Sequence, residues 1–380
     1  MAKTIAVGDG RTATDADAAD VGGGFPVHRI ETDPPVYALR PGIGLCLSGG
    51  GYRAMLFHAG ALWRLNELGW LPKLTTVSSV SGGSIAAGVL AHAWHKLYFG
   101  DDGVAENFGK EVVQPLRKLA RTNLDVPVTL KAMLMPWRSA GEELARRYAK
   151  HLFGDCCLAD LDRAGPNFVF TATSLQDGSL WWFFRQSGPH GRIPLATAVA
   201  ASSAFPPLLS PVVIPDPHQP ERKIVLSDAG VYDNLGLDPI ENQRATVLVS
   251  DAGKKMKHEE KPRHSWPMQL FRVLTVMDNQ VRELRTGSLL KSYQDKRFAG
   301  TYWATYSDIT HFDLDDALPA PVEQTRALAV TKTRLTRMPE RTQDHLINWG
   351  YAVCDAGMRR WVCPETTLKP EFPYPGSGVG

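Results

Sequence analysis

Three short segments rich in glycine and serine could do chemistry, and each follows a short apolar run that predicts a buried strand. They are Ser48-Gly49-Gly50-Gly51, Ser79-Val80-Ser81-Gly82-Gly83 and Ser227-Asp228-Ala229-Gly230. Open α/β sheets bind ligands at the carboxyl ends of their strands. We therefore expect the three segments to meet at one edge of a sheet and to form a single site there.

The glycine triplet suits the binding of an anion. Gly49, Gly50 and Gly51 stand between a predicted strand and a predicted helix. Glycine lets the backbone turn sharply and expose its N–H groups, and amides at a helix N-terminus stabilise negative charge. An oxyanion hole or a phosphate cradle fits this pattern, and a tight turn that needs glycine for its backbone alone fits it equally well.

Ser81 lies where a nucleophilic serine would lie. A nucleophile elbow has the pattern G-x-S-x-G between a strand and a helix, and here Ser79 replaces the first glycine. Small neighbours let such a serine occupy a strained turn with its hydroxyl exposed, and the amide of Gly82 follows it. A serine that caps the N-terminus of a glycine-rich helix has the same local sequence.

Asp228 is a candidate general base, since a carboxylate at a strand end can take a proton from a nearby hydroxyl. An aspartate that caps the following turn is the simpler interpretation. The same four residues recur at Ser250-Asp251-Ala252-Gly253. The tetrapeptide alone therefore does not choose between Asp228 and Asp251.

Taken together, these segments resemble the patatin-like phospholipase family. Residues 48–53 are similar to that family's G-G-G-x-R/K-G oxyanion motif, and Ser81 lies in its elbow. Asp228 stands where the family has D-G-G or D-G-A, and residues 201–207 are similar to its A-S-x-A-x-P segment. The four motifs occur in the family's order over residues 42–253, which is far more specific than any one motif.

The resemblance implies a fold and a mechanism. The fold is a three-layer α/β/α sandwich with a mostly parallel central sheet. In the mechanism, Ser81 attacks an ester carbonyl and Asp228 takes the hydroxyl proton directly, without a histidine. The resemblance assigns the oxyanion hole to four glycines, which are Gly49, Gly50, Gly51 and Gly82. It also selects Asp228, because residues 231–234 continue as in the family, and leaves Asp251 as a neighbour of the site.

The sequence departs from the family pattern at Ala54, Ser79 and Ala229, each of which replaces a glycine. All three are small, but an alanine held at positive φ would carry strain and reduce activity. Arg53 could pair with a substrate phosphate or brace the glycine loop, and we favour the brace.

The implied activity is that of a serine lipid acyl hydrolase of the phospholipase A type, a carboxylic ester hydrolase. Its substrate would be a phospholipid or another lipid ester. Nothing in the sequence resembles a calcium-binding loop, so we expect no metal and no cofactor.

Two other functions fit parts of the pattern. A Ser-His-Asp esterase needs a histidine after its aspartate, and His311 and His345 satisfy that order. The second is a non-enzymatic module that binds a phosphate or nucleotide at the glycine triplet. Against it, no Lys-Ser/Thr follows the glycines and no G-x-G-x-x-G occurs.

The elements that must position these residues alternate between strands and helices, which favours an α/β fold with a mostly parallel sheet. Asp177-Gly178 predicts a hairpin turn, and Pro194 and Pro206 should bound a helix. The expected strands are residues 43–47, 74–80, 168–173, 180–185, 223–226 and 246–249, and the expected helices include residues 84–94, 116–148 and 270–290. We expect one catalytic domain at residues 25–368 between flexible tails at 1–24 and 369–380.

Composition narrows the partners and the compartment. The net charge is only +2, from 42 basic and 40 acidic residues, so we expect no nucleic acid partner. Five cysteines without C-x-x-C and the lack of an apolar leader indicate a cytoplasmic protein. Residues 254–297 hold eleven Lys or Arg and five Asp or Glu around an apolar stripe. This segment could make a peripheral membrane contact, or it is an ordinary solvated face over core contacts.

Overall fold

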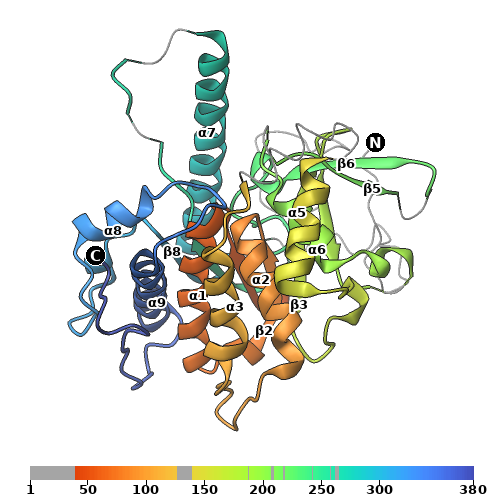
Figure 1. Ribbon diagram of the computed structural model, residues 1–380. Helices are drawn as coiled ribbons and strands as arrows, with labels where there is room; N and C mark the ends of the chain where they lie inside the picture. Colours follow the sequence, from red (N-terminus) through yellow and green to blue (C-terminus); the bar gives the residue numbers. More distant parts are fainter. Residues whose placement is uncertain are drawn as a thin grey trace, which may run out of the picture.

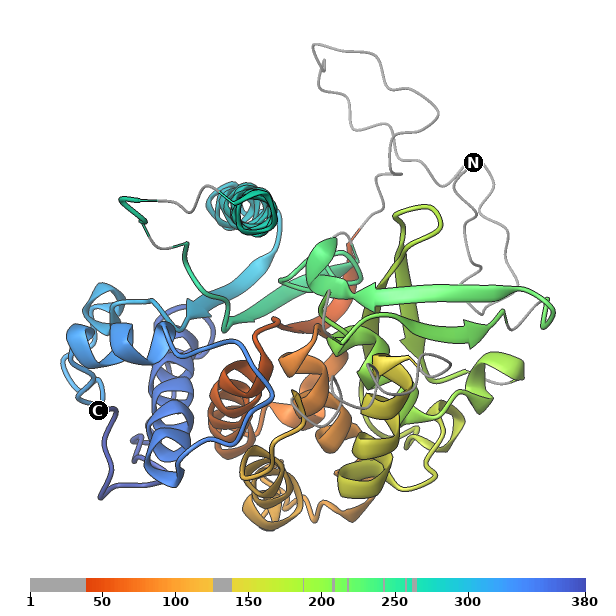
Figure 2. The ribbon, with the colours of Figure 1, turned by 45° about the horizontal axis from the view of Figure 1, so that its top comes forward.

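The computed structural model describes residues 39–125, 139–186, 188–206, 209–216, 219–241, 243–256, 258–261 and 265–380. The predicted N-terminal tail at 1–24 and residues 126–138 of the predicted helix at 116–148 lie outside the described residues. A mixed, mostly parallel sheet with helices on both faces forms the body (Figures 1 and 2). The predicted three-layer α/β/α fold is therefore confirmed.

The sheet has the strand order β5-β6-β3-β2-β1-β7-β8, and β4 pairs with β3. The strands β3, β2, β1, β7 and β8 run parallel to one another, whereas β4, β5 and β6 pair in antiparallel fashion. The strands are β1 Arg40–Leu47, β2 Leu74–Ser79, β3 Asn167–Ser174, β4 Leu180–Phe184, β5 Val212–Pro215, β6 Lys223–Asp228, β7 Arg244–Asp251 and β8 Ala299–Ala304.

The helices divide between the two faces of the sheet (Figure 2). Most of them pack on one face and build the larger core, whereas α7 lies on the other face, where Leu289 contacts the smaller core around Val247 and Val249. The helices are α1 Gly51–Glu67, α2 Gly82–Ala93, α3 Gln114–Ala120, α5 Ala140–Tyr148, α6 Leu195–Ser203, α7 Trp266–Gln294, α8 Val322–Ala329 and α9 Glu340–Trp361. Among the described helices, none combines the length and apolar character needed to cross a bilayer.

The strands β2 and β6 meet end to end along one edge of β3. β4 pairs along one edge of β3, over residues 169–173. The other edge of β3 pairs first with β2, over residues 167–170, and then with the antiparallel strand β6, over residues 172–174. β2 is parallel to β3 and β6 is antiparallel to it, along the same edge of β3. The two strands therefore approach one point from opposite directions.

This arrangement brings two of the predicted site residues to one level of the sheet. Asp228 is the last residue of β6 and pairs with Ala172. Ser79 ends β2 and pairs with Phe170 in the parallel register. Ser81, two residues further along, therefore reaches the level of Ala172, where Asp228 lies.

The C-terminal segment at 369–380 differs from the expectation of a loose tail. The side-chain amide of Asn348, on α9, donates to the carbonyl oxygens of Tyr374 and Gly378 at 2.8 and 2.7 Å. The guanidinium of Arg117 lies over the Tyr374 ring, and Val379 is buried.

Candidate active site

Ser81 occupies a strained turn between β2 and α2. Its backbone has φ 50° and ψ −115°, a region that non-glycine residues enter only when their surroundings hold them there. Its N–H donates to Ser202 Oγ at 3.0 Å. Ser81 stands at the N-cap position of α2, yet its side chain makes no capping hydrogen bond. The capping interpretation therefore fails for this serine, and its hydroxyl remains available for chemistry.

A chain of buried hydroxyls lies beneath the turn. Ser202 Oγ is 2.8 Å from Ser84 Oγ, and Ser84 Oγ donates to Ser79 Oγ at 2.9 Å. Ser79 Oγ in turn donates to the Val169 carbonyl oxygen of β3 at 3.2 Å. The serine that replaces the first elbow glycine thus takes part in the network that holds Ser81. Sequence reasoning missed Ser84 and assigned no role to Ser202, although the 201–207 motif contained it.

Asp228 is buried, with 1% of its surface exposed, and its two carboxyl oxygens differ. Oδ1 accepts a hydrogen bond from the Gly230 N–H at 2.7 Å, which is the predicted turn cap. Among the described residues, Oδ2 finds no hydrogen-bond partner of ordinary geometry. Burial raises the pKa of this carboxyl to about 7, although the Gly230 amide and the nearby Ser81 hydroxyl act to lower it. The carboxyl can therefore gain and lose a proton near neutral pH beside Ser81.

The N-termini of α1 and α2 abut next to Ser81. Gly50 has φ 147° and Gly51 has φ 60°, which favour glycine. At Gly82 the constraint is space, because an added Cβ would lie 2.1 Å from the Gly51 carbonyl oxygen. Two helix N-termini at one point create a positive potential suited to an anion.

The predicted oxyanion-hole glycines are not equivalent in the structure. The Gly49 N–H donates to the Asn234 carbonyl oxygen at 3.1 Å, so it already has a partner. The Asn234 side-chain oxygen also lies close to both Gly49 and Gly230. Asn234 therefore lies between the glycine loop and the Asp228 turn, a position that its place in the sequence did not reveal.

Arg53 is buried and ties three segments together. Its Nε and Nη2 donate to the Ala252 carbonyl oxygen at 3.1 and 2.9 Å. Its Nη1 donates to the Thr331 carbonyl oxygen at 2.6 Å and to Thr333 Oγ1 at 3.0 Å. This arrangement is that of a brace behind the glycine loop.

The two alanines that replace family glycines lie outside the left-handed region. The described non-glycine residues with positive φ are Ser81, Lys296 and Asp313. Ala54 lies within α1, and Ala229 begins the short turn Ala229–Val231. Neither substitution therefore strains the backbone.

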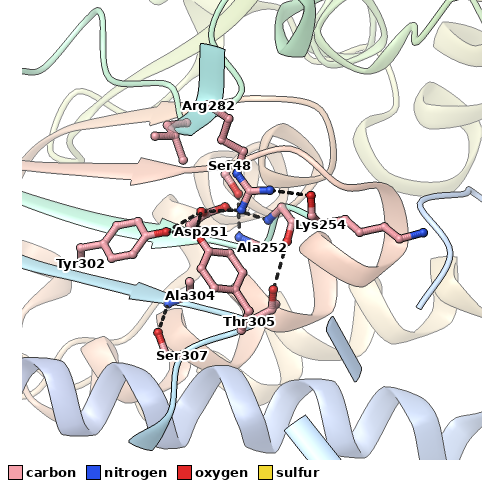
Figure 3. A network of polar contacts seen from close by, with 12 residues as sticks. Ser48, Asp251, Ala252, Lys254, Arg282, Tyr302, Ala304, Thr305 and Ser307 are labelled. Carbon is pink, nitrogen blue, oxygen red and sulfur yellow. Dashed lines mark hydrogen bonds and ion pairs between the residues drawn. The ribbon is translucent and has the colours of Figure 1, made fainter. Parts of the chain in front are cut away.

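Asp251 has the surroundings of a structural carboxylate (Figure 3). Its Oδ2 accepts hydrogen bonds from Arg282 Nη2 at 2.7 Å, Tyr302 Oη at 2.7 Å and Tyr306 Oη at 2.9 Å. Its Oδ1 accepts from the Gly253 N–H at 2.7 Å. Burial alone would raise the pKa of this carboxyl, but Arg282 and the hydrogen bonds hold it below its usual value. Asp251 is therefore ionised and fully paired.

The histidines considered for a triad lie elsewhere. His311 is exposed in the turn Ile309–Phe312, and His345 Nε2 accepts from Arg341 Nε at 3.4 Å. The buried His58 bonds the Ser48 carbonyl oxygen and Ser250 Oγ, and burial lowers its pKa to about 4. Within the described residues, no histidine bonds the Asp228 carboxyl.

No group of three or more His, Cys, Asp or Glu side chains in the described ranges is placed to hold a metal ion. All five cysteines are free thiols.

Comparison with known proteins decides the family. The family model described as patatin-like phospholipase matches residues 45–240, more than half of the 380 residues. The chain belongs to the patatin-like phospholipase family. This is a family of lipid acyl hydrolases, and the resemblance inferred from the motifs is confirmed. No curated protein matches the sequence.

Several solved structures are similar to this patatin-like chain at low identity. Human GIVD cytosolic phospholipase A2 is 12% identical with a TM-score of 0.45, over 84% of this chain and 61% of that chain. VipD from Legionella pneumophila is 16% identical with a TM-score of 0.35, over 85% and 68%. The type III effector ExoU is 13% identical with a TM-score of 0.32, over 86% and 54%. The chain thus spans about three fifths of the length of the human enzyme.

Proposed function

We propose that the protein is a serine lipid acyl hydrolase of the phospholipase A type, which cleaves fatty-acyl esters of a phospholipid or another lipid ester. One observation carries the proposal. The buried Asp228 carboxyl has an unpartnered oxygen beside the Ser81 hydroxyl, and its pKa is about 7. A general base works best when its pKa lies near the working pH, so this carboxyl suits the removal of a proton from Ser81.

The reaction begins with Ser81 Oγ. This oxygen attacks the acyl carbonyl carbon while its proton passes to Asp228 Oδ2. The Gly230 N–H keeps Oδ1 in place throughout. The tetrahedral intermediate then expels the alcohol of the lipid, which takes the proton from Asp228. Water attacks the acyl-enzyme in the same way, with Asp228 as base, and releases the fatty acid and the free Ser81 hydroxyl.

The negative charge of the tetrahedral oxygen would be held by backbone amides at the joined starts of α1 and α2. The amides of Gly50, Gly51 and Gly82 are the donors in this proposal. The Gly49 amide would have to exchange its bond to the Asn234 carbonyl oxygen in order to contribute. Removal of one donor from such a hole typically lowers the rate by about 10²–10³.

Apolar side chains beside the carboxylate support a lipid substrate. Phe205 and Val231 are 58% and 51% exposed. Phe205 follows Ala204, whose carbonyl oxygen accepts the Asp228 N–H at 3.1 Å, and Val231 is the last residue of the turn that Asp228 caps. An acyl chain could cover such residues on its way to Ser81. The proposal includes peripheral contact with a membrane and a cytoplasmic location, with which five free thiols agree.

The proposal is tested by labelling and by fatty acid release. A fluorophosphonate probe should modify intact protein at Ser81, as mapped by mass spectrometry. Ser81→Ala should abolish both labelling and release of fatty acid from phospholipid vesicles. Ser179→Ala, in the exposed β3–β4 turn, is the matched control and should retain both. Full activity in the Ser81→Ala protein would overturn the proposal, and loss of activity in His311→Ala or His345→Ala would point to a triad.

A further inference from the structure

The helix α7 is much longer than the strands that it connects. At 1.5 Å per residue its 29 residues span about 43 Å, whereas the eight residues of β7 span about 27 Å. Arg282 Nη2 bonds Asp251 Oδ2 at 2.7 Å, which fixes the helix at the last residue of β7. Residues 266–281 precede that ion pair and therefore extend past the edge of the sheet (Figure 1).

The projecting part of α7 is apolar and exposed. Trp266, Leu270, Val273, Met277 and Val281 recur at spacings of three and four residues, so they lie along one helix face. Each of them is between 43% and 76% exposed. A surface helix of a globular protein normally turns such a stripe toward the core. Here the stripe is exposed instead.

Residues 282–294 of the same helix pack against the sheet, as a surface helix normally does. Leu289 is buried in the smaller core against the sheet, and Tyr293 Oη donates to the Val247 carbonyl oxygen at 2.7 Å. Among the described side chains of α7, the buried ones begin at Arg282. The exposure of residues 266–281 therefore follows from their position beyond the sheet rather than from a poorly packed helix.

Basic side chains flank the projection in the segment that leads from β7 to α7. Lys254 and Lys255 are exposed directly after β7, and Lys261 is exposed shortly before the helix begins. Glu259 and Glu260 of the same segment are exposed as well, and Glu259 pairs with Arg272 of the helix. In the projecting part itself, Arg272 and Asp278 are the charged residues. An apolar helix face with basic residues at its flank is the pattern that binds an anionic lipid surface.

We propose that residues 266–281 of α7 insert their apolar stripe into a membrane surface that contains anionic phospholipid. The orientation of the docked protein relative to the membrane rests on the proposed function. β7 and β2 run parallel, so α7 projects beyond the same sheet edge at which β2 leads into Ser81. A protein docked through this stripe presents its nucleophile to the layer that holds the acyl esters. The stripe could instead bind a second copy of the chain, which the experiment distinguishes.

The binding experiment uses the full chain with Ser81→Ala, so that the vesicles stay intact. Sedimentation with phosphatidylcholine vesicles, with and without phosphatidylglycerol, measures the partition coefficient. The triple variant Leu270→Gln/Val273→Gln/Met277→Gln should lower it by about a hundredfold or more, because three apolar side chains of the stripe lose their burial in lipid. The matched control is Leu284→Gln, which lies on the body side of Arg282, is 72% exposed, and should leave binding unchanged.

A charge variant separates the two contributions to binding. Lys254→Gln/Lys255→Gln/Lys261→Gln should lower binding to phosphatidylglycerol-containing vesicles by about tenfold or more. It should leave the weaker binding to pure phosphatidylcholine unchanged. Equal losses on both kinds of vesicle would contradict the assignment of an anionic surface.

Hydrogen exchange on the Ser81→Ala chain tests the same surface without altering it. Vesicles should protect amides in 266–281. Unchanged exchange there, or equal vesicle binding by the triple variant, would overturn the proposal. So would a dimer in solution that the triple variant dissociates while neither protein binds vesicles.

Hydrolysis of a short-chain, water-soluble ester separates the docking proposal from the proposed function. The triple variant should hydrolyse this ester as the unmodified chain does and lose only phospholipid hydrolysis. If the unmodified chain hydrolyses neither ester yet the Ser81→Ala chain binds vesicles through α7, the proposed function fails and the docking surface stands.

Discussion

The tetrapeptide Ser-Asp-Ala-Gly occurs twice in this protein, each time at the end of a strand of the same sheet. The two turns are alike in their local bonds. In each of them the glycine N–H donates to the aspartate Oδ1 at 2.7 Å. Both carboxyls are buried. Local sequence and local geometry therefore leave Asp228 and Asp251 equivalent.

Their second carboxyl oxygens are not equivalent. Asp251 Oδ2 accepts hydrogen bonds from Arg282 and two tyrosines, and its pKa lies below the usual value. Asp228 Oδ2 has no partner of ordinary geometry in the part of the chain that the structure describes, and burial raises the pKa of the Asp228 carboxyl to about 7. Burial favours the neutral acid, and an adjacent cation favours the carboxylate. Arg282 keeps Asp251 ionised, whereas burial brings the pKa of Asp228 close to neutral pH, where this carboxyl can gain and lose a proton.

The largest expected difference between the two aspartates is in the rate of catalysis. Asp228→Asn keeps the shape of the side chain and the bond from Gly230, but it removes the proposed base. We expect kcat/KM for a water-soluble ester to fall by about a thousandfold, within the usual range for a general base. Asp251→Asn is the matched control and should retain most of the activity per folded molecule. An equal loss in both variants would show that the two carboxyls share one role.

The second expected difference is in the free energy of unfolding, where replacement of Asp251 should have the larger effect. Asp251→Asn leaves the buried Arg282 without its counter-ion, which typically costs about 3–5 kcal/mol. Urea unfolding should show this loss for Asp251→Asn and for Arg282→Met. The double variant should recover part of it, because no unpaired buried charge remains. Asp228→Asn should not lower stability at pH 8, since it removes an acid whose ionised form is disfavoured in the folded protein.

The two aspartates should also respond to pH in opposite ways. Because the pKa of Asp228 is about 7, kcat/KM should rise with pH up to about 7 and should be about a hundredfold lower at pH 5 than at pH 8. Its raised pKa also lowers stability as pH rises from about 4 to 7, because the unfolded carboxyl releases its proton first. The lowered pKa of Asp251 acts in the opposite sense, and its contribution is lost in acid. A pH profile of activity that is flat from pH 5 to 8 would refute the role of Asp228 as base.

The smallest expected effect on activity is that of Ser202, which holds the turn at Ser81. Ser202→Ala leaves the Ser81 N–H without its partner at a strained backbone position. A lost buried hydrogen bond of this kind costs about 1–3 kcal/mol, and we expect a roughly tenfold fall in kcat with little change in KM. The matched control is Ser203→Ala, whose hydroxyl bonds Val199 and Tyr148 instead. Equal effects of the two variants on kcat would show a general packing role.

Local features of the fold followed from the chain because each depends on neighbouring residues. The Asp177-Gly178 hairpin between β3 and β4 formed as predicted, and Pro194 precedes the α6 helix. The expected helix at 270–290 is α7. The C-terminal segment was not recognised as packed, because its contacts are with α9 and α3 rather than with residues close in sequence.

The amino-acid sequence by itself determined which residues can do chemistry here. The glycine triplet, the elbow around Ser81 and the turn after Asp228 depend on short-range backbone preferences, which the order of residues specifies. Only the tertiary structure decided how they are used. β6 runs antiparallel to β3, so Asp228 reaches Ser81 from the opposite direction. Arg282, far along the chain on α7, neutralises Asp251, whereas no cation among the described residues pairs with Asp228. Charge and burial act between residues that only the fold brings together, and they give two identical tetrapeptides different carboxyls, one the proposed base and the other an ion-paired anchor.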